Sequence, residues 1–105
     1  MAYYCTNKGY LYENGESKEM IINNGTDIKI QGMGATKGSY KLVGKLTKDS
    51  DNVPLSVINT KDFSTKSGGT SITDNGIYIA DVSGLYSVSV PSCSGFTAVY
   101  AKVGE

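Results

Sequence analysis

The segment Asp81-Val82-Ser83-Gly84-Leu85-Tyr86-Ser87-Val88-Ser89-Val90 decides the fold class. Its second half alternates apolar residues with serines, which is the two-residue period of a strand with one buried face and not the 3.6-residue period of a helix. Its first four residues have the composition of a tight turn that ends on glycine. A turn followed by alternation predicts antiparallel strands, with Val88 and Val90 facing the core.

The same pattern continues outward along the chain. Ile28 and Ile30 flank Lys29, and Tyr40 and Leu42 begin a further alternating run. Val, Ile, Tyr and Thr, which fill these runs, pack well on a pleated sheet. The predicted strands cover residues 2–6, 10–13, 19–22, 26–31, 39–47, 54–59, 71–73, 76–82, 85–90 and 96–103.

Turn residues separate these runs. Asn-Gly pairs at 14–15, 24–25 and 75–76 favour hairpin turns in which both central residues have positive φ. Residues 91–95 are expected to connect the last hairpin, and the polar stretch 48–52 is expected to be a surface loop. We predict an all-β fold, a single-domain antiparallel β-sandwich of the Ig-like or jelly-roll-like kind, with a small barrel as the alternative.

Length and charge limit the function. The chain has 105 residues, enough for a single domain over residues 1–105. Ten lysines and ten acids cancel, so the basic field of a nucleic-acid binder is missing. Histidine is absent from the sequence, which removes the usual general base and the commonest metal ligand. We expect no enzyme and predict no catalytic, cofactor-binding or metal-binding residues.

Three short motifs were weighed as sites and favour loops instead. The glycine-rich stretch 32–38 has Lys37 before Gly38, the reverse of a phosphate-binding loop. Asp49-Ser50-Asp51-Asn52 begins like a calcium loop, but the glycine and glutamate that should follow are replaced by Pro54 and Thr60. Asp74 and Asp81 flank one predicted strand and form only a weak metal-binding pair.

Cys5 and Cys93 are the two cysteines of the chain. In an oxidising compartment they could pair and join the terminal strands, whereas in a reducing one they would pack as small hydrophobic residues. The first residues do not form a signal peptide, and no apolar run is long enough to cross a bilayer. We therefore expect synthesis in the cytoplasm, without secretion, and no membrane partner.

Four of the eight tyrosines lie near the start, at Tyr3, Tyr4, Tyr10 and Tyr12. By alternation, Tyr10 and Tyr12 should share one face of a strand and Leu11 the other. Such tyrosines can pack across strands, form an oligomer interface or stack on a glycan.

The last two predicted strands carry almost no charge on the face expected to lie away from the core. Serines occupy these positions in 86–90, and Thr97, Val99 and Ala101 occupy them in the final strand. Solvent-facing strands usually carry charges that resist edge pairing. Either both strands lie in the middle of a sheet, or this surface packs on copies of the chain or on a larger assembly.

The run Ser71-Ile72-Thr73-Asp74-Asn75-Gly76-Ile77-Tyr78-Ile79-Ala80-Asp81-Val82-Ser83-Gly84-Leu85 resembles a segment of small all-β accessory virion proteins of tailed bacteriophages. The resemblance is a pattern of turns and strands, and it includes the strand that follows this run and the last strand. It also includes Lys41-Leu42-Val43-Gly44-Lys45-Leu46, so it covers about residues 39–103. It implies a virion structural protein, a capsid decoration, head-fibre or other auxiliary head protein. The alternative that the resemblance implies is a tail or adhesion component. The tyrosines and the Asn and Asp turns separately suggest a carbohydrate-binding β-sandwich as a further alternative. The implied partners are further copies of the chain and a major capsid or other virion protein, with glycans as a further possibility.

Overall fold

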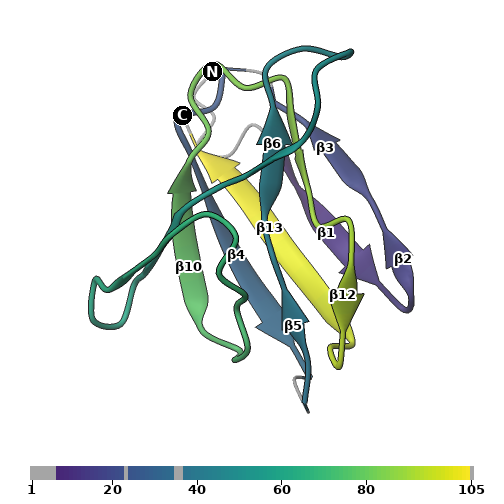
Figure 1. Cartoon of the computed structure of the whole chain (residues 1–105), viewed down its shortest axis with the longest axis vertical. Helices are drawn as coiled ribbons and strands as arrows, with labels where there is room; N and C mark the ends of the chain where they lie inside the picture. The colour runs from purple at the N-terminus through teal and green to yellow at the C-terminus, as the bar shows by residue number, and fades with distance from the viewer. Residues whose placement is uncertain (1–6, 23, 35–36, 105) are drawn as a thin grey trace.

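The computed structural model describes residues 7–22, 24–34 and 37–104, and within them every paired strand is antiparallel and no helix occurs. The strands form two main layers, visible in Figure 1 as the front and back of the molecule. The larger sheet has the order β2 (Glu16–Ser17), β1 (Asn7–Glu13), β13 (Ala98–Gly104), β4 (Asp27–Met33), β10 (Ile77–Asp81), β8 (Val57–Asn59) and β9 (Thr65–Lys66). The smaller sheet has the order β3 (Glu19–Ile21), β11 (Ser87–Ser89), β6 (Val43–Lys45) and β7 (Val53–Pro54), and β12 (Cys93–Ser94) pairs separately with β5 (Ser39–Tyr40).

The hydrophobic core lies between the layers and confirms the predicted all-β fold. Val88 and Val90 are at most 1% exposed, as their alternation with serines predicted. Leu42 is 2% exposed and belongs to the same cluster. Tyr40 packs edge-to-face against Phe96 with ring centroids 5.1 Å apart, a favoured aromatic geometry.

β13 lies between β1 and β4 and faces the core with residues that we predicted to lie away from it. Val99, Ala101 and Val103 are fully buried, while Lys102 is exposed on the other face. The prediction for Val99 and Ala101 was wrong because the alternation that starts at Phe96 does not continue into the strand, where Ala98 and Val99 are both buried. The uncharged side of this strand is therefore core.

A β-bulge in β1 also corrects the predicted tyrosine face. The register against β13 shifts between Tyr10, which pairs with Tyr100, and Tyr12, which pairs with Val99. Since Val99 faces the core, Tyr12 packs against the core cluster beside the fully buried Leu11. Tyr10 is 37% exposed on the outer face, so the two tyrosines do not share a face.

Two predicted strands break where the chain passes between sheets. The run 39–47 divides into β5 and β6, and the consecutive buried residues Leu42 and Val43 mark the break. The run 54–59 divides into β7 in the smaller sheet and β8 in the larger one. Residues 71–73 contribute one isolated bridge, between Ile72 and Tyr40, and the predicted strand 2–6 lies outside the described residues.

One Asn-Gly pair forms the predicted hairpin turn. Asn14 and Gly15 join β1 to β2 with φ of 50° and 91°. Asn24 and Gly25 instead lie between β3 and β4, which belong to different sheets, and residues 91–95 likewise lead from β11 to β13 across the sandwich. The predictions of hairpins at these two places were wrong, because local turn composition does not reveal which sheet the next strand joins.

Candidate interaction surface

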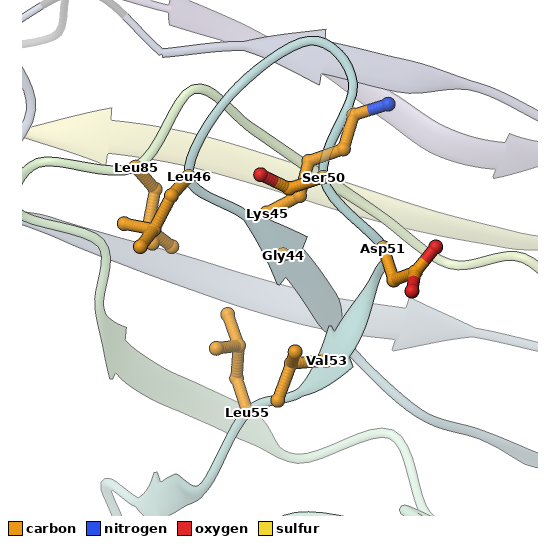
Figure 2. Close-up of a pocket in the computed structure, with 8 residues that line it drawn as sticks. All are labelled: Gly44, Lys45, Leu46, Ser50, Asp51, Val53, Leu55 and Leu85. Atoms are coloured by element: carbon orange, nitrogen blue, oxygen red, sulfur yellow. The ribbon is translucent and has the colours of Figure 1, made fainter.

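An apolar hollow of about 300 Å³ opens beside β6 and β7 (Figure 2). Leu46 and Val53 form its exposed rim and are 66% and 59% exposed. Leu55 and Leu85 form its half-buried walls and pack against the core cluster. The lining residues are Gly44, Lys45, Leu46, Ser50, Asp51, Val53, Leu55 and Leu85.

Gly44 forms the floor of the hollow. It pairs with Val88 across the β6–β11 ladder, so both positions face the core side of the smaller sheet. A Cβ added at Gly44 would lie 2.9 Å from Cδ1 of Leu85 and 3.2 Å from Cδ1 of Leu55. The tips of Leu55 and Leu85 therefore pack directly against the backbone at position 44, and a side chain there would displace these two walls of the hollow.

The polar side chains beside the hollow point away from the leucines or are engaged within the chain. In Figure 2 the Asp51 carboxylate points away from the leucine side chains. Ser50 is bonded through its hydroxyl to Thr47 over 2.7 Å. Nζ of Lys45 lies 3.3 Å from the Glu19 carboxylate. The interior that a partner would meet is therefore largely apolar.

The Glu19 carboxylate also anchors β11 to β3. It accepts a hydrogen bond of 2.6 Å from the hydroxyl of Ser87, which is only 1% exposed. This bond, helped by Lys45, lowers the pKa of Glu19 below its usual value of 4.5. Ser87 points away from the core, but it is buried and hydrogen-bonded to Glu19, which explains why an uncharged residue occupies this position.

Both nearly uncharged strands lie in the middle of their sheets, β11 between β3 and β6 and β13 between β1 and β4. Central placement is one of the two explanations that the sequence left open, and it is confirmed. The absence of charge on these strands follows from burial. Exposed apolar side chains lie elsewhere, and Leu46 and Val53 are among the most exposed of them.

The described residues of the three short motifs lie in loops and at strand ends. Asp74 precedes β10 and Asp81 ends it, so the strand, roughly 16 Å long at about 3.3 Å per residue, separates them. Asp74 accepts hydrogen bonds from the Tyr78 hydroxyl at 3.1 and 3.2 Å, and burial together with this carboxylate raises the pKa of Tyr78 to about 12. Across residues 7–22, 24–34 and 37–104, no group of three or more His, Cys, Asp or Glu side chains gathers as a metal site.

At the end of the glycine-rich stretch, the backbone of Gly38 lies against the backbone of Ser94 in β12 and of Gly95, which follows it. Gly38 lies so close to Ser94 and Gly95 that a Cβ on it would overlap their backbone atoms. Cys93, next to this contact, has a free thiol, and partial burial raises its pKa, as expected of a small hydrophobic residue. Cys5, Tyr3 and Tyr4 lie outside the described residues. In the part of the chain that is described, no helix is long and apolar enough to span a membrane.

No protein family matches this sequence, and no curated protein is similar to it. Among solved structures, the crystal structure of SPBc2 prophage-derived protein YomS is similar in fold. The TM-score is 0.76 at 22% sequence identity, over 94% of this chain and 92% of that chain. The two chains share a fold. The similarity extends over nearly the whole of both chains.

Proposed function

We propose that this protein is a non-enzymatic structural component of a tailed-phage particle, a capsid decoration or auxiliary head protein that acts by assembly. The observation that carries the proposal is the match in fold, over 94% of this chain, to a protein described as prophage-derived. The resemblance of residues 71–85 to small virion proteins supports it independently. The proposed partners are further copies of the chain and another virion protein.

The hollow beside β6 and β7 is the proposed contact with the other virion protein. Its lining exposes apolar side chains that a monomer would leave in water, and burying apolar surface is the main favourable contribution to most protein association. A volume of about 300 Å³ accommodates one large apolar side chain of the partner. Leu55 and Leu85 pack against the core cluster, so the walls of the hollow are in place before a partner binds. Few side chains therefore have to be ordered on binding.

Purified particles test this proposal. Particles of the phage whose genome carries this chain are banded on a density gradient, and their proteins are counted by quantitative mass spectrometry. We expect a fixed, high copy number of the chain in each particle. A chain that is produced in infected cells but absent from the banded particles would overturn the proposal.

Substitutions on the rim test the hollow itself. Leu46→Asp and Val53→Asp place a charge in the apolar lining, and we expect each to reduce incorporation into particles at least tenfold. Phe63→Asn is the matched control, because Phe63 is 79% exposed, lies outside the hollow and has a φ of 60° that asparagine tolerates. Equal incorporation of all three variants would exclude the hollow as the contact while leaving the particle assignment intact.

A further inference from the structure

The outer face of the larger sheet carries a row of three lysines. Lys8, Lys102 and Lys29 are directly paired across β1, β13 and β4, so their side chains project from the same face. All three are exposed, and like charges directly opposite one another destabilise a sheet. The ion pairs found in the described part of the chain involve Lys18 and Lys45 and not these lysines.

Next to the lysine row, two aspartates form a second row of paired residues on the same face of the larger sheet. Asp27 and Asp81 are directly paired between β4 and β10, two residues from Lys29 along β4. A backbone hydrogen bond of 2.8 Å from Ser83 to Asp81 lowers the pKa of this carboxyl, so it is ionised at neutral pH. A basic row and an acidic pair therefore stand side by side.

Each row borders its own depression. The basic depression has a volume of about 210 Å³ and is lined by Lys29, Ile30, Gln31, Ile77, Tyr100 and Lys102. The acidic depression has a volume of about 400 Å³ and is lined by Thr26, Asp27, Ile58, Ile79, Ala80, Asp81 and Ser83. Isoleucines occur in both, and Ile58 and Ile77 are 40% and 43% exposed. Apolar contact is thus available beside both kinds of charge.

We propose that this outer face binds a second copy of the chain, so that the lysine row of each copy faces the Asp27–Asp81 pair of the other. A two-fold axis that lies in the interface between the two rows brings Lys29 of one copy over Asp27 of the other, and the same contact repeats by symmetry. Such a dimer forms the Lys29–Asp27 contact twice and brings Lys102 and Asp81 to within one strand of an opposite charge, because they lie on the strands that flank β4. It also covers the exposed isoleucines of this face. A purely anionic ligand would meet the lysines but would be repelled by Asp27 and Asp81.

The size of the face predicts a weak dimer. Five neighbouring strands at about 4.8 Å spacing give a width of roughly 24 Å, and their length is roughly 20 Å. The projected area of roughly 500 Å² is below the 800 Å² or so per partner of a standard interface. We therefore expect a dissociation constant in the micromolar range that weakens with salt, since exposed ion pairs are screened. Many copies on a particle would add such weak contacts together.

The proposal names the self-association surface of the proposed assembly function, and its test uses purified protein alone. Sedimentation velocity is measured at low salt over a range of protein concentrations for the wild type and two variants. Lys29→Glu with Lys102→Glu makes the face acidic. Asp27→Lys with Asp81→Asn makes it basic, and asparagine at 81 keeps the side-chain oxygen that accepts from Ser83. Lys41→Glu with Lys48→Glu is the control, because it changes the net charge as much as the double lysine variant does but lies outside this face.

We expect the wild type and the control to dimerise, each face variant alone to associate at least tenfold more weakly, and an equimolar mixture of the two to dimerise again. Circular dichroism confirms that each variant is folded, and a variant that does not fold is replaced by Lys29→Glu or Asp27→Lys alone. A wild type that remains monomeric at millimolar concentration would overturn the proposal, as would a dimer that neither variant weakens. Incorporation into particles is measured separately, so a failed dimer does not decide the proposed function.

Discussion

The hollow beside β6 and β7 and the outer face of the larger sheet are both exposed, but they are built differently. The hollow is a continuation of the core, with Leu55 and Leu85 in its walls and a glycine at its floor. On the outer face, the strands turn every second residue away from the core, and charged side chains there line up in rows across neighbouring strands. Substitutions in the walls of the hollow, at Leu55 and Leu85, should therefore affect folding, whereas those on its exposed rim and on the outer face should mainly affect association.

The largest expected effect is at the core beneath the hollow. Leu42→Ala and Val88→Ala should each lower the free energy of unfolding by about 2–4 kcal/mol, because both remove volume from a close-packed interior. Urea denaturation followed by circular dichroism measures the change. A loss below about 0.5 kcal/mol at both positions would mean that the assigned core face is wrong.

A second pair of substitutions compares the two surfaces directly. Leu85→Ala removes a half-buried wall of the hollow and should cost about 1–2 kcal/mol, whereas Ile58→Ala on the outer face should cost less than about 1 kcal/mol because Ile58 is 40% exposed. Denaturation is carried out at low protein concentration, where the chain is monomeric. Equal losses at the two positions would remove the distinction between the surfaces.

The lysine row predicts a substitution that stabilises the monomer. Lys29→Thr removes a like-charge neighbour of Lys102 and adds a residue with high β-propensity. The free energy of unfolding should rise by about 0.2–1 kcal/mol at low salt and by less at high salt, where charges are screened. If the variant is less stable than the wild type at low salt, repulsion within the row is not significant.

The smallest expected effect concerns pH and the Glu19 carboxylate, which faces Ser87 of β11 and Lys45 of β6. Its folded-state pKa is lower than its usual value of 4.5, so its contribution to stability is complete above that pH and is lost as the pH falls through the lower folded pKa. Glu19→Gln should flatten the acid limb of the stability profile, measured by thermal unfolding between neutral and acidic pH. An unchanged acid limb would show that the carboxylate contributes nothing.

Local patterns predicted the fold class because strands such as β4 and β10 alternate buried and exposed residues with a period of two. Val88, Val90 and Leu42 were assigned to the core correctly, and Asn14 with Gly15 forms the predicted turn. Sheet membership was not predictable in this way, since nothing local distinguishes a hairpin turn from a connection between layers. Residues 91–95 were misassigned for this reason.

The surfaces were less predictable than the core. The uncharged strands suggested a docking face, but Val99 and Ala101 face the core, and Ser87 is buried and hydrogen-bonded to Glu19. The hollow depends on Gly44 lying opposite Val88, and the charged rows depend on the register of four strands. Register joins residues far apart in sequence, so neither surface has a local signal.

Electron cryomicroscopy of the intact particle tests the central claim most directly, namely that this sandwich acts by contact with neighbouring subunits. We predict ordered density for many copies of the sandwich on the particle, with the Leu46 and Val53 rim seated against another virion protein. A particle reconstructed at side-chain resolution without this chain, although the chain is produced in the infected cell, would contradict the claim.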